Sequence, residues 1–256
     1  MSTVGKAADI LEVFSIERPE IGLSDVSRMA GFDKATCHRL LLALTRGGLV
    51  ERNPETRLYR LGPAVVRLAR IREAHFPFME SAREPIETLS KSTGETAHLT
   101  EYDSGALTSL LVCESSRANR ISVAVGDRLP LNATASGLAF LAFGPSAVRE
   151  RLLGSALKRY TEHTIHSPED LNQEIANTLA RGYSIGHQGR EDGVFSVGAP
   201  VLNAEGIAIG AVSLAAPVYR VDDAAIEHFG GAVMSAAQDI SIRLFGAPES
   251  LRRSAV

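Results

Sequence analysis

The segment between Asp33 and the glycine pair Gly47–Gly48 is the feature that most constrains the fold of this 256-residue chain. Its apolar residues recur at the spacing that lines one face of an α-helix: Cys37, Leu40, Leu41 and Leu44. Aspartate is a residue type that caps the start of a helix, and glycine commonly ends one. We therefore predict a helix that begins after Asp33 and ends at the glycine pair.

Two shorter helices are predicted before it. Residues 7–14 carry apolar side chains at helical spacing. A second apolar stripe covers residues 23–30, with Ser24 as its cap and Gly31 as its end. Two helices joined by a tight turn at Gly31 predict a helix-turn-helix.

The solvent-facing side of the third helix carries the candidate DNA contacts. These residues are Lys34, Ala35, Thr36, His38, Arg39 and Arg46. A recognition helix contacts base edges with its N-terminal residues, so we expect residues 34–39 to meet bases and phosphates, with Arg39 reading guanine. A merely solvated face would carry the same residue types, so this face alone leaves both interpretations open.

The residues after this helix favour DNA binding. Residues 49–52 and 57–61 predict two short strands around the turn at residues 53–55, and such a hairpin directly after a recognition helix is a wing. Arg52 and Arg57 flank its tip, where they can reach the DNA backbone or minor groove.

The charge distribution agrees with this interpretation. Residues 1–75 hold twelve Lys and Arg against nine Asp and Glu, whereas residues 76–256 hold fifteen against twenty-one. A basic end on an acidic body is typical of a DNA-binding module attached to another domain.

A helix is predicted to follow the wing, because Pro63 suits a first helical turn. Its apolar residues are Val65, Val66, Leu68, Ala69 and Ile71. This stripe could pack on its own winged domain. We expect it to pack on a second copy, because a two-fold dimer would set two recognition helices about one DNA turn apart over a pseudo-palindromic site.

The remaining sequence alternates helices with extended runs. After a helix ending near Lys91, strands are predicted at residues 96–102, 106–113, 194–202 and 207–217, and helices at 136–143, 171–181 and 224–245. This order predicts an α+β fold that resembles a sensor domain.

Motifs typical of one known family occur along nearly the whole chain. The N-terminal ones are Ala8-Asp9-Ile10-Leu11 with Phe14, Leu23-Ser24, Ala35-Thr36-Cys37-His38-Arg39-Leu40-Leu41 with Leu44 and Gly48, and Tyr59-Arg60-Leu61-Gly62. The later ones cover residues 126–131, 133–139, 181–183 and 193–201. These motifs resemble the IclR family of bacterial transcription regulators.

This resemblance implies a division of the chain into three parts. We expect a winged helix-turn-helix DNA-binding domain at residues 1–62, a linker helix at 63–76, and a GAF-like effector-binding domain at 77–250. It further implies a homodimer or homotetramer on a double-stranded DNA operator, acting as repressor or activator under the control of a small acidic or aromatic effector.

The effector site is expected at a loop of small residues, 132–137, that enters a helix. Free backbone N–H groups near Ala135 and Ser136 would be positively polarised there and would suit a carboxylate. A simple capped helix entry is the alternative. The resemblance implies that these two amides hold the effector's carboxylate and that Ser196, Ser213 and Ala215 line the cavity.

Three positions differ from the family pattern. Gly186 stands where the family has a pocket aspartate, Ser196 replaces a common cysteine, and Ala215 replaces a second serine. Because these residues are small and uncharged, we expect an effector larger than a two- or three-carbon keto acid, such as an aromatic acid. His98, Thr100 or His187 would add a polar contact. His98 also suits the role of a hydrogen-bonded core residue.

No catalytic signature is found in the sequence, so we expect no catalytic residue, no metal and no cofactor. His163 and His166 lack a third ligand, and two distant cysteines make neither a disulfide framework nor a zinc site. A small-molecule enzyme with an appended helix-turn-helix remains the alternative function. A constitutive architectural DNA binder does not explain the large acidic domain.

Without a long apolar run or a signal peptide, the expected location is the cytoplasm, with no membrane partner.

Overall fold

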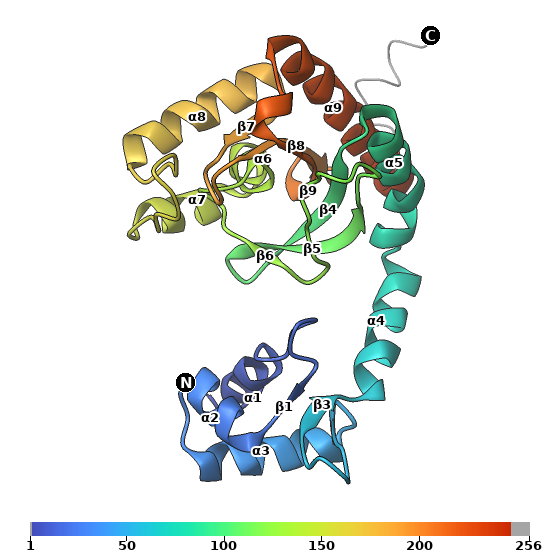
Figure 1. Cartoon of the computed structure of the whole chain (residues 1–256), viewed down its shortest axis with the longest axis vertical. Helices are drawn as coiled ribbons and strands as arrows, with labels where there is room; N and C mark the ends of the chain where they lie inside the picture. Colours follow the sequence, from blue (N-terminus) through green and yellow to red (C-terminus); the bar gives the residue numbers. More distant parts are fainter. Residues whose placement is uncertain (1, 247–256) are drawn as a thin grey trace. The chain divides into compact units, whose positions relative to one another are not determined.

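The computed structural model describes residues 2–246 of a chain that divides into two compact units, residues 1–76 and 77–256 (Figure 1). Each unit has its own core, and each is described by itself below. The finer division at residues 62 and 76 stays a prediction. Residues 247–250, which the predicted effector domain includes, lie outside the described residues.

The first unit is a winged helix-turn-helix. Its elements are α1 (Thr3–Leu11), β1 (Glu20–Ile21), α2 (Leu23–Ala30), α3 (Lys34–Arg46), β2 (Val50–Arg52), β3 (Tyr59–Leu61) and α4 (Pro63–His75). The predicted stripe of α3 is buried, and it packs with the inward faces of α1 and α2. Burial of these apolar faces in one core stabilises three helices that are each too short to be stable alone.

The predicted N-terminal cap is confirmed for α3 and is wrong for α2. The Asp33 side chain accepts a hydrogen bond from the Thr36 backbone N–H at 2.8 Å, so it caps α3 as predicted. Gly31 ends α2 in the left-handed conformation, with φ 71°. The prediction that Ser24 caps α2 is wrong, because the helix begins at Leu23 and Gly22 occupies the cap position, two residues earlier.

The wing contains a strand that the sequence did not indicate. β3 pairs with β2, as predicted for the hairpin, and also with β1, which gives the order β1-β3-β2. A two-residue strand is too short to show an alternating pattern.

The apolar stripe of α4 is open to solvent. Val66, Leu68 and Ile71 are 60%, 48% and 50% exposed. These three side chains therefore do not pack on the winged domain, whereas Val65 is half-buried. Packing of the stripe on a second copy stays a prediction.

The second unit is an α+β domain built on a curled antiparallel sheet (Figure 1). Its helices are α5 (Phe78–Thr93), α6 (Ala135–Phe143), α7 (Ser146–Leu153), α8 (Pro168–Arg181) and α9 (Asp223–Phe245), with the short 3-10 helix η1 (Val218–Arg220) before α9. The strands are β4 (Thr96–Asp103), β5 (Ala106–Cys113), β6 (Arg128–Leu129), β7 (Ser184–His187), β8 (Val194–Leu202) and β9 (Ala208–Pro217), in the order β6-β5-β4-β9-β8-β7.

Helices cover both faces of this sheet. α5 and α9 pack together on one face, and α6 lies on the other, backed by α8 (Figure 1). Within residues 2–246, none of the helices combines the length and the apolar character needed to cross a bilayer. The predicted strands and helices of this unit are confirmed within a few residues, whereas β6, β7 and α7 were not predicted.

Strand register brings distant residues together on the α6 face. Ser213 of β9 lies opposite His98 of β4. Ser196 of β8 lies opposite Ala215 of β9 and Gly186 of β7. Because side chains alternate between the two faces of a sheet, these residues point to the same side. The register thus positions the polar residues of a cavity at the N-terminus of α6.

Candidate functional site

The exposed side of α3 presents a basic surface at its N-terminal half. Lys34, Ala35, His38 and Arg39 are exposed, as is Arg46 in the last turn. Thr36 is only half-buried, and its hydroxyl donates to the Asp33 carboxylate at 2.8 Å. Hydrogen bonds from Thr36 hold the pKa of the Asp33 carboxyl below its usual range, so the cap stays ionised. Thr36 is thus engaged by the Asp33 cap, whereas the exposed side chains of Lys34, His38 and Arg39 can contact a partner.

The two wing arginines are linked by the backbone. The Arg52 Nε donates to the carbonyl oxygen of Arg57 at 3.0 Å, and the Arg52 guanidinium lies 5.4 Å from the ring centre of Tyr59. Arg57 itself has a φ of 63°, in the left-handed region. Both side chains are exposed at the tip of the wing. The structure therefore places all eight candidate DNA contacts in the first unit, and seven of them are exposed.

A cavity of about 140 Å³ lies beside the N-terminus of α6. Seven of the eight candidate effector residues line it: His98, Ala135, Ser136, Gly186, Ser196, Ser213 and Ala215. Apolar side chains supply further walls, among them Ile121, Val123, Leu129 and Val194. The cavity combines a polar end at the sheet with an apolar lining, as in many small-molecule sites.

The N-terminus of α6 supplies donors to this cavity. The Thr134 hydroxyl caps the helix by accepting from the Gly137 N–H at 3.1 Å. The N–H groups of Ala135 and Ser136 come before the first intrahelical hydrogen bond, which leaves them available to an anion. The Ser136 hydroxyl also lies 2.7 Å from that of Ser213.

Glycine in the sheet allows this close approach. A Cβ at position 198 would stand 2.9 Å from the Ala135 carbonyl and 2.9 Å from the Ser213 Oγ, closer than real Cβ atoms come to other groups. Gly186 has the same role, since its Cβ would lie 2.4 Å from the Ser196 Oγ and 2.9 Å from the Ala135 nitrogen. The expectation that Gly186 leaves extra room is therefore wrong, because α6 and Ser196 occupy the space beside it.

His98 is a buried, neutral side chain of the cavity. It is 4% exposed, and burial, followed by the nearby charge of Arg190, lowers its pKa to about 4. Its Nε2 lies 3.4 Å from the Ser136 Oγ, and its Nδ1 has no hydrogen-bond partner among the described residues. His98 is therefore not the fully hydrogen-bonded core residue that was one expectation.

The sequence reasoning missed a cation in the cavity lining. Arg190 lines the cavity and forms an ion pair with Asp127, another lining residue, at 3.9 Å. Arg190 follows β7 in the sequence, whereas Asp127 precedes β6 at the other edge of the sheet. Only the fold brings the two together, although the position of Arg190 four residues after the candidate pocket residue Gly186 was a usable signal.

Two other predicted polar contacts lie outside the cavity lining. His187 follows Gly186 on β7, so its side chain points away from α6, and its ring lies near those of His163 and Phe195. Thr100 is buried, and its hydroxyl donates to the Ala211 carbonyl at 3.1 Å. Neither residue lines the cavity.

The histidine pair in the loop before α8 does not form part of a cluster of metal ligands. The His166 Nδ1 lies 3.0 Å from the Thr164 carbonyl oxygen. Over residues 2–246, no group of three or more His, Cys, Asp or Glu is arranged to hold a metal ion.

Comparison with known proteins gives consistent matches over both units. The family described as IclR helix-turn-helix domain matches residues 3–54, and the one described as bacterial transcriptional regulator IclR C-terminal matches residues 74–242. The HTH-type transcriptional regulator XynR of Escherichia coli (strain K12) is 32% identical over 97% of this chain and 98% of its own length.

Solved structures agree with these matches. One from Silicibacter sp. TM1040, described as an ICLR transcriptional regulator, is 35% identical with a TM-score of 0.89, over 96% of this chain and 98% of that one. An IclR homologue from Microbacterium hydrocarbonoxydans, solved in complex with 4-hydroxybenzoate, is 26% identical with a TM-score of 0.76, over 95% and 99%.

The neutral state of His98 leads to a prediction about acid stability. Its pKa of about 4 in the folded chain lies below the ordinary 6.5, so between these values the unfolded state binds more protons. The free energy of unfolding should therefore fall as the pH falls from 6.5 to 4, by up to about 3 kcal/mol. Chemical denaturation of the wild type and of His98→Gln across this range measures the effect. The variant should lose this part of the pH dependence, and identical slopes would contradict the prediction.

Proposed function

Because this chain belongs to the IclR family of bacterial transcriptional regulators, we propose that a small aromatic acid, bound in the α6 cavity, controls its binding to a pseudo-palindromic operator. The regulator class and the presence of DNA-binding and effector-binding domains follow from the family. The ligand class, the contact residues, the domain boundaries and the cytoplasmic location are the parts proposed here.

The cavity is the observation that carries the ligand class. An apolar cavity of about 150 Å³ is known to hold benzene, so a cavity of about 140 Å³ is of the size of a single aromatic ring. The amides of Ala135 and Ser136 and the Arg190 guanidinium line it, and these are donors for a carboxylate. The complex of the Microbacterium relative with 4-hydroxybenzoate supports a ligand of this kind.

We take the cavity to be a binding site without catalysis. Ser136 and His98 are the one pair that resembles a nucleophile and its base, at 3.4 Å. The His98 Nδ1 contacts no carboxylate among the described residues, so no third group orients the ring. A pKa of about 4 also makes this imidazole a weak base at neutral pH.

DNA binding is assigned to α3 and the wing. Residues Lys34, Ala35, His38 and Arg39 would enter the major groove, while Arg52 and Arg57 would reach the adjacent backbone or minor groove; Thr36 and Arg46 would lie beside phosphates. The exposure of all these residues except the half-buried Thr36 supports this assignment.

The exposed apolar face of α4 supports a homodimer, or a tetramer built from dimers. Val66 and Ile71 lie on one side of α4 and are 60% and 50% exposed, so burying them against a second copy removes apolar area from water. Two-fold symmetry would then match a pseudo-palindromic operator. For the effector to control the operator, it must bind two arrangements of this assembly with affinities that differ by about 1–3 kcal/mol.

Replacing Arg39 should weaken operator binding. A bidentate arginine–guanine contact contributes about 1–3 kcal/mol, so Arg39→Ala should lower the affinity by roughly 5- to 150-fold. A salt-titrated mobility shift on the DNA upstream of the protein's own gene measures it. Arg18→Ala, which removes the same charge from a turn outside α3 and the wing, is the control. Unchanged affinity of Arg39→Ala would refute the groove assignment.

The ligand class is tested by calorimetry. We expect benzoate and 4-hydroxybenzoate to bind more tightly than pyruvate and glyoxylate. Arg190→Gln should weaken benzoate binding by about tenfold or more, because it removes a charge-assisted donor, while Arg151→Gln on the exposed side of α7 should not. Binding of the small keto acids without the aromatic ones would overturn the ligand class.

The assembly is tested by sedimentation. The double variant Val66→Glu, Ile71→Glu should sediment with a lower mass than the wild-type oligomer, because burying two charges in the interface would destabilise it. Leu179→Glu on α8 is a matched control, because this leucine is 48% exposed. An unchanged mass for the double variant would show that α4 is not the interface.

A further inference from the structure

Residues 114–127, here called the cavity strap, connect β5 to β6 and cover one side of the α6 cavity. Ile121, Ser122, Val123 and Asp127 of the strap line the cavity. At its C-terminal end, the strap is held to β5 by hydrogen bonds between the backbones of Ser109 and Gly126 and of Ser109 and Asp127, at 2.7 and 2.9 Å. The N-terminal part of the strap is held in place by side-chain contacts.

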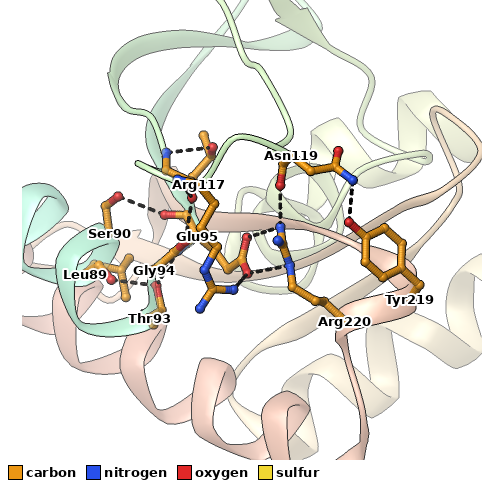
Figure 2. A network of polar contacts seen from close by, with 11 residues as sticks. Leu89, Ser90, Thr93, Gly94, Glu95, Arg117, Asn119, Tyr219 and Arg220 are labelled. Atoms are coloured by element: carbon orange, nitrogen blue, oxygen red, sulfur yellow. Dashed lines mark hydrogen bonds and ion pairs between the residues drawn. The ribbon is translucent and has the colours of Figure 1, made fainter.

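Those side chains meet at one buried carboxylate (Figure 2). Glu95 lies between α5 and β4 and is 2% exposed. Its Oε1 is 2.6 Å from the Arg117 Nη1 and 3.1 Å from the Arg220 Nε. Arg117 belongs to the strap, whereas Arg220 ends η1, just before α9. The carboxylate therefore joins the strap to the segment that leads into α9.

Further hydrogen bonds extend this contact along the strap. The Arg220 Nη2 donates to the carbonyl oxygen of Asn119 at 2.7 Å, and the Asn119 side chain contacts the Tyr219 hydroxyl (Figure 2). The Thr96 hydroxyl donates to the Ile121 carbonyl oxygen at 2.6 Å. Ile121 is itself a cavity residue, so this network ends at the cavity wall.

Stability alone does not account for the buried charge. Burial raises the pKa of the Glu95 carboxyl, and the charges of Arg220 and Arg117 oppose this without cancelling it. Buried ion pairs are in general a poor source of folding stability compared with apolar packing. The ion pairs of Glu95 instead fix the position of the strap, because the carboxylate accepts hydrogen bonds from two guanidinium groups on separate segments.

We propose that Glu95 and Arg220 are positioning residues for effector binding, which hold the cavity strap against the α6 cavity and thereby slow the release of the bound ligand. This rests on the proposed ligand function of the cavity. Loss of the carboxylate charge would weaken the contacts of Arg117 and Arg220 with this side chain, because a neutral amide oxygen is a weaker acceptor for a guanidinium than a carboxylate. The wall formed by Ile121 and Val123 would then open more often, and dissociation would accelerate more than association.

The test compares Glu95→Gln with the wild type in the full-length protein. Glutamine keeps the shape of the side chain and removes its charge. Glu174→Gln is the matched control, because Glu174 forms a partly buried ion pair with Arg181 on α8, away from the strap. Three quantities are measured: the affinity for benzoate by calorimetry, its dissociation rate by stopped flow, and backbone hydrogen exchange of residues 114–127 without ligand.

We expect Glu95→Gln to bind benzoate about tenfold more weakly, mainly through faster dissociation, and to exchange faster in residues 114–123. Glu174→Gln should match the wild type in all three. Arg220→Gln should reproduce the Glu95→Gln result and serves as the second variant if the first does not fold.

Two outcomes would overturn the proposal. One is wild-type exchange in the strap together with wild-type dissociation of benzoate in both variants. The other is exchange that rises equally over the whole second unit, which indicates a general loss of stability. If the wild type binds no acid while strap exchange still rises in Glu95→Gln, the ligand function of the cavity fails and the anchoring of the strap stands.

Discussion

The close packing of the α6 N-terminus on the sheet is the constraint on which the ligand cavity depends. An α-helix can place its free N–H groups near a strand only if the strand has no side chain at the point of contact. Gly198 meets this condition, since a Cβ there would stand 2.9 Å from the Ala135 carbonyl. Any larger residue would push α6 away from Ser213 and separate the polar groups that the strand register has aligned.

The electrostatics of the cavity follow from this packing. The helix end contributes partial positive charge, Arg190 contributes a full one, and Asp127 balances it at 3.9 Å. His98 remains uncharged because burial and Arg190 both disfavour its protonation. An entering carboxylate would thus meet donors and a cation, with Asp127 as its competitor for Arg190. Asp127 belongs to the strap. A carboxylate that displaced Asp127 from Arg190 would therefore remove one contact of the strap, and this is a physical reason for the strap to respond to the ligand.

Local sequence patterns predicted much of the fold. The capped start of α3, its buried stripe and the wing hairpin depend on neighbours within a few residues, and the structure confirms them. The strands β6 and β1, by contrast, have two residues each, which is too few for a periodic pattern. The error at Ser24 has a similar origin, because glycine and serine are both acceptable caps and the local pattern does not decide between Gly22 and Ser24.

The cavity was only partly accessible to sequence reasoning. The small-residue loop indicated the helix end, and the resemblance to a family added the strand positions Ser196, Ser213 and Ala215. Seven of the eight candidate effector residues line one cavity. Arg190 and Asp127 were missed because strand order, not sequence distance, makes them neighbours. His187 was misplaced for a simple reason: a one-residue step along a strand reverses the face.

The wing tip shows how function and stability oppose each other in this fold. A left-handed backbone costs a residue other than glycine roughly 1–2 kcal/mol, and Arg57 adopts it with a φ of 63°. Glycine would relieve that strain but would remove a cation from the surface proposed to contact DNA. The Arg57 carbonyl oxygen also accepts from the Arg52 Nε, so the strained residue helps to orient Arg52. The wing of this protein therefore combines a strained backbone at Arg57 with a preorganised charge at Arg52.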